Sequence, residues 1–147
     1  MMRVHIGYPP PQVEQRLMLS PEIDRVATVP PVLDPQSLVR LQREVERVKV
    51  DPSLGAYTQN VLTATRTSPA IAIGASTRAG FNLMRAAKAR AKLRNRDYCI
   101  ADDIHDLAVP VLAHRIRLAA QADGYVPNYD EAEATVRDLV ARVVVPV

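Results

Sequence analysis

Residues 73–114 read IGASTRAGFNLMRAAKARAKLRNRDYCIADDIHDLAVPVLAH, and this stretch decides the fold because it holds the chain's clearest helix pattern. Ser76 is expected to cap a helix, since its hydroxyl can accept from the free backbone N–H groups two or three residues later. Good helix formers without proline follow up to about Arg96. Apolar residues recur every four positions on one face: Ala79, Leu83 and Ala87. The pattern predicts a long helix whose alanines let another helix approach closely.

Positive charge is concentrated on this helix. From Arg78 to Arg96 there are seven Lys or Arg residues and no Asp or Glu. Three of them recur every seven residues, almost two full turns, and so share one face: Arg78, Arg85 and Lys92. The basic stripe, which consists of Arg85, Lys88, Arg90, Lys92, Arg94 and Arg96, allows three interpretations. It is a solvated face, a contact with an acidic face of a neighbouring subunit, or a nucleic-acid contact. Without aromatic stacking residues, nucleic acid is the weakest of these and the solvated face the favoured one.

The order of motifs in the chain resembles a known family. Four features follow one another here in the same order as in the C-terminal lid of MoxR-type AAA+ ATPases, which the chain resembles. They are G-A-S-x-R-A, an alanine-rich basic helix, N-R-D-Y-C-x-x-D-D-I and V-L-x-H-R. The resemblance reaches to about Arg117. It implies a remnant of the last ATPase-core strand and turn at 1–10, a short helix and connection at 11–33, the helical lid at 34–117, and a C-terminal extension with one helix at 118–147.

Composition supports a helical domain. The 147 residues suffice for one compact domain. Because 48% of them are hydrophobic but only 4% aromatic, the core must consist mostly of Ala, Val, Leu and Ile, which suits packed helices. We predict an all-α bundle of four to five helices, with at most a short N-terminal strand. The net charge of +3 is too mild to argue for nucleic acid, and a single cysteine allows no internal disulfide. No apolar run is long enough for a membrane span and no signal peptide is evident, so a soluble cytoplasmic protein is expected.

The remaining elements are predicted from local signals. Met2–Ile6 alternates enough for a short strand, although no partner strand is obvious nearby. Helices are expected at 12–19, 35–47, 52–66, 102–114 and 130–142, and extended segments at 48–50 and 98–100. Pro110 should kink or split its helix near Val109. The last helix should have Ala134, Leu139 and Val140 as its apolar side. Residues 20–31 and 118–128 should be connections.

Arg78 carries the sharpest functional hypothesis. It follows the expected cap in the first helical turn, where free N–H groups, the helix dipole and a guanidinium together favour an anion. By spacing alone, a solvated arginine is the better interpretation. The resemblance implies instead that Arg78 is the sensor-2 residue, which reaches the terminal phosphate of ATP, with Ser76 and Thr77 beside it at the nucleotide. Thr77 stands where the family often has proline, and it starts the helix less rigidly.

Other polar residues offer less. Asp102 and Asp103 are adjacent and diverge by about 100° on a helix, so helix capping is favoured over a catalytic pair. The three histidines are far apart, and no His, Cys or Asp cluster has metal-ligand spacing, so no metal site is predicted. His114–Arg115 is expected to stabilise a helix C-terminus. Cys99 is expected to be buried and inert.

The chain lacks the parts of a complete ATPase site. There is no G-x-x-x-x-G-K-[ST] loop, and none of its three lysines follows a glycine. We therefore expect no ATP hydrolysis by this chain alone. The resemblance implies ATP and Mg²⁺ in the complete ATPase, with the ATPase core half and neighbouring subunits as partners. It also implies a ring of usually six subunits, a chaperone-like role, and often a partner with a von Willebrand factor A domain. The alternatives are a decayed ATPase and a stand-alone helical interaction module that binds nucleic acid through residues 78–96.

Overall fold

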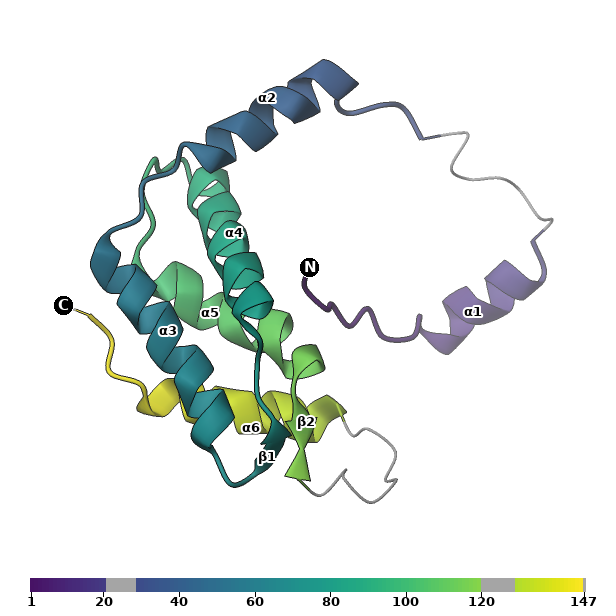
Figure 1. Ribbon diagram of the computed structural model, residues 1–147. Coiled ribbons are helices and arrows are strands. Elements are labelled where there is room, and N and C mark those ends of the chain that lie inside the picture. The colour runs from purple at the N-terminus through teal and green to yellow at the C-terminus, as the bar shows by residue number, and fades with distance from the viewer. Residues whose placement is uncertain (21–28, 120–128, 147) are drawn as a thin grey trace.

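The computed structural model describes residues 1–20, 29–119 and 129–146. Within them lie six α-helices and two short strands: α1 (Pro11–Met18), α2 (Pro35–Glu46), α3 (Pro52–Thr67), β1 (Ile71–Ile73), α4 (Thr77–Leu93), α5 (Ala101–Leu112), β2 (Arg117–Leu118) and α6 (Tyr129–Arg142), with a 3₁₀ turn, η1 (Ala113–Arg115), after α5. Figure 1 shows α3 to α6 packed as a bundle, α2 against one end of α4, and α1 apart from them. The predicted all-α bundle is confirmed.

The helices begin where the capping signals predicted. The carboxylate of Asp34 accepts from the Ser37 N–H at 2.8 Å, and that of Asp51 accepts from the Ser53 N–H at 2.8 Å. A proline follows each of these caps at the first helical position, where no N–H is needed. The Ser76 hydroxyl accepts from the Ala79 N–H at 3.3 Å. These signals work because each involves only neighbouring residues.

The end of α4 differs from the prediction. The helix stops at Leu93 rather than near Arg96, because Asn95 adopts a left-handed conformation with φ 56°. The Asn95 N–H donates to the Lys92 carbonyl at 2.9 Å, and the Arg96 N–H donates to the Ala91 carbonyl at 2.9 Å. This pair of bonds is a Schellman motif, and asparagine tolerates its left-handed position better than most residues do.

One core joins α3, α4, α5 and α6. Its fully buried side chains come from all four helices: Tyr57 and Val61, Leu83 and Ala87, Ile104 and Ala108, and Val136. On α6, Val140 is buried and Leu139 half-buried as predicted, but Ala134 is exposed. The buried stripe of α6 runs instead through residues 132, 136 and 140. Because α6 has short apolar residues on two faces, the helices packed against it determine which face is buried.

The predicted N-terminal strand is wrong. Residues 2–6 form no strand, because alternation needs a neighbouring strand and none lies beside them in the described structure. Instead the Arg3 N–H donates to the Pro110 carbonyl at 2.8 Å, and its guanidinium lies 3.6 Å from the centre of the Tyr129 ring. The strands that do form are β1 and β2, which pair antiparallel. Leu118, expected in a loop, therefore belongs to a strand, while residues 21–28 and 120–128 of the predicted connections lie outside the described residues.

Pro110 does not split its helix at Val109. α5 continues to Leu112 before it tightens into η1. Proline removes one intrahelical bond, but the buried Ala108 and Val111 on either side of it hold the helix against the core. The Arg115 Nε–H donates to the Val111 carbonyl at 3.0 Å, which confirms the predicted role of this arginine at a helix C-terminus.

Candidate functional site at the start of α4

The chain enters α4 through a backbone that α3 holds tightly. Ala75 is 1% exposed, and both of its backbone polar groups bond to α3. Its N–H donates to the Thr65 hydroxyl at 3.0 Å, and its carbonyl accepts from the Arg66 Nε–H at 2.9 Å. A Cβ on Gly74 would lie 2.7 Å from the Arg66 Cα, so only glycine fits there without a shift of the backbone. The Gly-Ala pair of the motif is therefore a packing requirement.

Most of the residues that follow also serve the fold. The Ser76 hydroxyl caps α4, and Ala79 is fully buried against the bundle. A Cβ on Gly80 would lie 2.7 Å from a methyl group of Leu62, so this position also lies close against α3. Between Gly74 and Gly80, only Thr77 and Arg78 have exposed side chains without such a contact. The structure thus separates residues that hold the site from residues that are open to a ligand.

Arg78 lies exposed in the first turn of α4. It forms no ion pair with any described residue, and no acidic residue shares its helical turn. Phe81, 67% exposed, and Arg85 continue the same side of the helix. An unpaired guanidinium beside the free N–H groups of a helix N-terminus is suited to bind an anionic group such as a phosphate. Ser76 and Thr77, the other predicted ligand residues, flank it; the Ser76 hydroxyl already accepts the capping bond.

The basic stripe farther along α4 differs from the favoured solvated face. Four of its six residues contact other parts of the chain. Lys88 donates to the Glu46 carbonyl at 3.0 Å, and Lys92 pairs with Glu44 at 2.8 Å, so both connect α4 to α2. Arg90 and Arg96 bond to groups around α5. Because these charges are satisfied within the chain, the nucleic-acid interpretation, which needs them free, loses most of its basis.

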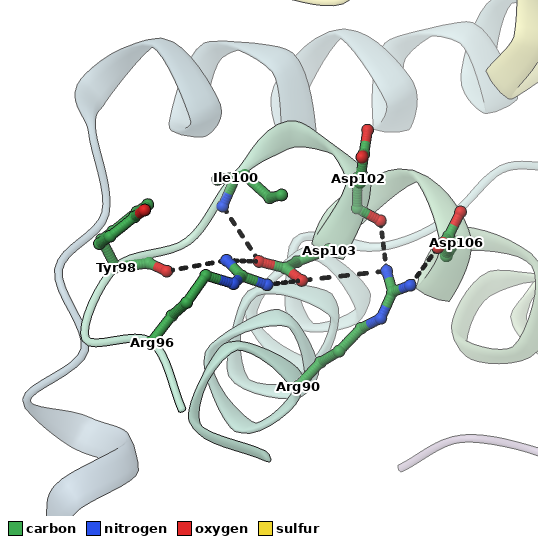
Figure 2. Close-up of polar contacts among 7 residues, drawn as sticks. All are labelled: Arg90, Arg96, Tyr98, Ile100, Asp102, Asp103 and Asp106. Atoms are coloured by element: carbon green, nitrogen blue, oxygen red, sulfur yellow. Dashed lines mark hydrogen bonds and ion pairs between the residues drawn. The ribbon is translucent and has the colours of Figure 1, made fainter. Parts of the chain in front are cut away.

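Figure 2 shows where the two arginines converge on the start of α5. The Asp103 carboxylate is fully buried and accepts from both terminal nitrogens of Arg96, at 2.7 and 2.8 Å, and from the Ile100 N–H at 3.0 Å. Arg90 lies 3.9 Å from it and also bonds to Asp106 and to the Asp102 carbonyl. The sequence had indicated capping by this acid, which is confirmed, but the ion pairs were missed. They give a structural role to Arg96 of N-R-D-Y and to the second acid of D-D, Asp103.

The burial of Asp103 is balanced by its partners. Desolvation alone would raise the pKa of this carboxyl, but the hydrogen bonds from Arg96 and Ile100 and the charges of Arg96 and Arg90 lower it below its ordinary value. Asp103 in turn raises the pKa of Arg96. The group is therefore ionised and fully bonded within the fold. Such a carboxylate stabilises the junction of α4 and α5 and is not available for acid–base chemistry.

Among the described residues, the remaining ionisable and metal-binding groups indicate no second site. Cys99 is 6% exposed, and burial raises the pKa of its thiol, so it is a poor nucleophile as predicted. His114 is half-buried, and burial followed by the charge of Arg115 lowers its pKa. Among the described residues, no three His, Cys, Asp or Glu side chains lie together as metal ligands would. In the same residues, no helix combines the length and the apolar character of a membrane span.

Comparison with known proteins identifies the family to which this chain belongs. The model of the AAA lid domain family matches residues 63–139, from the end of α3 to most of α6. The chain belongs to the AAA lid domain family. Its match includes the Ala75 contacts, Arg78 and the Asp103 cluster, so these three features lie within the matched segment.

Individual relatives specify the type of lid. Over 100% of this chain, the sequence is 37% identical to the uncharacterised protein YeaC of Bacillus subtilis. The match covers 45% of YeaC. The chain is 31% identical to the chaperone MoxR1 of Mycobacterium tuberculosis over 83% of this chain and 34% of MoxR1. A crystal structure of a protein from Cytophaga hutchinsonii, described as a candidate ATPase, matches all of this chain and 47% of its own with a TM-score of 0.76 and 28% identity.

These relatives confirm the resemblance drawn from the motifs. The AAA lid domain described here is of the MoxR type of AAA+ ATPases. It spans less than half the length of each of these three proteins. A lid role in an AAA+ ATPase follows from this membership.

Proposed function

We propose that this lid contributes Arg78 as the sensor-2 arginine of a MoxR-type ATPase. In this proposal ATP and Mg²⁺ bind in the cleft between an ATPase core and the lid, and Arg78 contacts the terminal phosphate. Phosphoryl transfer depends on placed positive charge, so the arginine both stabilises the transferred group and links its presence to the lid's angle. The core supplies the phosphate-binding loop and the magnesium ligands, and the lid supplies this one charge.

The exposed, unpaired Arg78 at a firmly held helix N-terminus is the observation that carries the proposal. Arg90 of α4 and Arg96, three residues beyond its end, are both paired with acids of the same fold. Thr77 replaces the family's frequent proline, yet α4 still begins at this residue with Ser76 as its cap. The departure from the motif therefore leaves the position of Arg78 in its helical turn intact.

The resemblance to MoxR-type ATPases supports the assembly we propose. The lid works in a ring of subunits, usually six, in which its angle transmits nucleotide state to subunit contacts in a chaperone-like complex. A protein with a von Willebrand factor A domain is the partner we propose for this complex. The single cysteine suits a reducing compartment, and we propose the cytoplasm.

The test uses a fusion protein in which an ATPase core is joined to the N-terminus of this chain. It compares two substitutions. Arg78→Ala should lower ATP turnover on the order of 100-fold, the usual effect of removing one group that stabilises transition-state charge. Arg85→Ala is the matched control, because it removes the same side chain from the same exposed side of α4 two turns later. Both variants should unfold at the wild-type urea concentration, since exposed substitutions rarely change stability.

Equal turnover in the two variants would refute the sensor-2 assignment. The chain without a core should show no ATP hydrolysis above the background of the buffer. Hydrolysis by the isolated chain that Arg78→Ala abolishes would also contradict the proposal, because it would place a complete site within the lid.

A further inference from the structure

The polar contacts of Ala75 form a clamp between α3 and the start of α4. Thr65 is fully buried, and its hydroxyl donates to the Leu62 carbonyl at 2.7 Å while it accepts from the Ala75 N–H at 3.0 Å. The first bond fixes the direction of the hydroxyl hydrogen, so a lone pair is left for Ala75. Arg66 donates its Nε–H to the carbonyl of the same residue at 2.9 Å. Both backbone groups of one buried residue are thus held by two adjacent side chains.

We propose that Thr65 and Arg66 are positioning residues that aim Arg78 through Ala75. This inference rests on the sensor-2 function proposed above. Ala75 precedes the cap of α4 by one residue and Arg78 by three, so the direction in which α4 leaves the clamp sets the place of the guanidinium. Upstream, β1 holds the same loop through its pairing with β2, with Ile71 opposite Leu118. The loop is therefore fixed at both ends, and α4 cannot tilt at its start without breaking a buried hydrogen bond.

The position of Gly74 supports the clamp. The backbone of this residue lies so close to α3 that an added Cβ would meet the Arg66 backbone at 2.7 to 2.8 Å. Such an approach brings Ala75 within reach of the short Thr65 side chain. A loop that only joined two helices would not need contact of this kind. Together the contacts keep the α4 N-terminus at one distance and one angle from α3.

The chain supplies a matched control for Thr65. Thr58 lies two turns earlier on α3 and is also buried, at 6% exposed. Its hydroxyl donates only to the Leu54 carbonyl of its own helix, at 2.9 Å. Replacing either threonine with valine removes one buried hydroxyl and keeps the shape of the side chain. Only Thr65→Val leaves the Ala75 N–H without a partner.

The experiment measures ATP turnover of the core-joined protein with these substitutions. Thr65→Val should lower turnover on the order of tenfold, because small misplacements of a group near the reacting atoms reduce rates strongly. Thr65→Ser should restore most of it, since serine keeps the hydroxyl. Thr58→Val should leave turnover near the wild-type value. Arg66→Met removes the guanidinium, and with it the part-buried bond to the Ala75 carbonyl, but keeps the side-chain stem. It should show a smaller loss of turnover, and it tests the clamp if Thr65→Val does not fold.

A double substitution separates positioning from general damage. If Thr65 acts through Arg78, then Thr65→Val should cause no further loss in a protein that already carries Arg78→Ala. Independent losses that multiply in the double variant would overturn the inference, as would equal turnover of Thr65→Val and Thr58→Val. If Arg78→Ala itself lowers turnover while Thr65→Val and Arg66→Met do not, the sensor-2 function stands and only the clamp fails. If Arg78→Ala has no effect on ATP turnover, the proposed sensor-2 function is refuted, and so is the inference that rests on it.

Discussion

Two glycines of this chain should respond to alanine with opposite signs. Gly74 lies in the loop before α4, and Gly55 lies in the first half of α3. An added Cβ at Gly74 would come within 2.7 Å of the Cα and Cγ of Arg66 and 2.8 Å of its backbone nitrogen, whereas at Gly55 no atom lies within 4 Å. Carbon atoms normally approach to about 3.5–4.0 Å, so Gly74→Ala requires a movement of roughly 1 Å between the loop and α3.

The magnitudes follow from these distances. Because backbone atoms line the contact at Gly74, no side chain can swing away to relieve it, and overpacking of this kind costs about 1–3 kcal/mol. Gly55→Ala should instead stabilise the protein by about 0.5–1 kcal/mol, since alanine restricts the unfolded chain and favours the helix. Neither glycine has a positive φ, so backbone strain does not enter the comparison.

The assay is urea unfolding followed by circular dichroism at the helix band. Gly74→Ala should unfold at a lower urea concentration than wild type and Gly55→Ala at a higher one, with unchanged slopes. In thermal unfolding the same changes correspond to about 2–4 °C for each kcal/mol in a chain near this size. If Gly74→Ala unfolds at or above the wild-type midpoint, the close approach of the loop to α3 is wrong, and the clamp on Ala75 loses its support.

Three further predictions test the buried polar groups. Asp103→Asn should destabilise the protein by about 3 kcal/mol because Arg96 loses its buried partner, whereas Asp102→Asn, at the exposed neighbour, should change stability by less than about 0.5 kcal/mol. Since the pKa of Asp103 is lowered, its contribution to the free energy of unfolding is complete above the unfolded pKa of about 3.9 and is lost as pH falls through the folded value. The difference in urea midpoint between wild type and Asp103→Asn should therefore be large at pH 7 and small in acid. A difference that does not shrink in acid would contradict the ion pair. Burial and the charge of Arg115 lower the pKa of His114, so its ring should titrate below about 6.5 by NMR, and a higher midpoint would contradict its placement. Cys99 should react slowly with a thiol reagent in the folded protein and rapidly in urea, since burial raises its pKa and blocks access; rapid reaction without urea would show that the link between α4 and α5 is open.

The parts of the fold that the sequence predicted are those set by neighbouring residues. Asp34, Asp51 and Ser76 cap their helices because the accepting side chain and the donating N–H groups lie within three residues of each other. The left-handed residue that ends α4 was also present in the sequence as Asn95, but asparagine is common enough in helices that its position alone did not mark the end.

Features that depend on distant residues were missed. The strand predicted at residues 2–6 needed a partner, and whether a partner exists is not a property of those residues. The choice of Val136 over Ala134 as the buried residue of α6 depends on how α3 and α5 meet that helix. The contact of Thr65 with Ala75 joins residues ten positions apart across a loop, and threonine near a helix end has many other uses.

The candidate site shows the same limit in its charges. A row of basic residues on one helix predicts a basic surface only if the acids of the fold lie elsewhere. Here Glu44 approaches from α2 and Asp103 and Asp106 from α5, so the C-terminal half of α4 is largely neutralised within the chain. The partners come from both sides of α4 in the sequence, and no local pattern connects them to it.

This division of charge decides which substitutions are informative about function. Just after the C-terminal end of α4, replacing Arg96 leaves the buried Asp103 carboxylate without its main partner, so a loss of ATPase activity there would report a damaged fold. At the N-terminal end, Arg78 has no partner among the described residues whose loss could disturb the bundle. The two ends of one helix therefore separate stability from chemistry. If ATP turnover responds to Arg78 and Thr65 while the urea midpoint responds to Asp103, the lid uses the fold to hold a single charge in position at the start of α4.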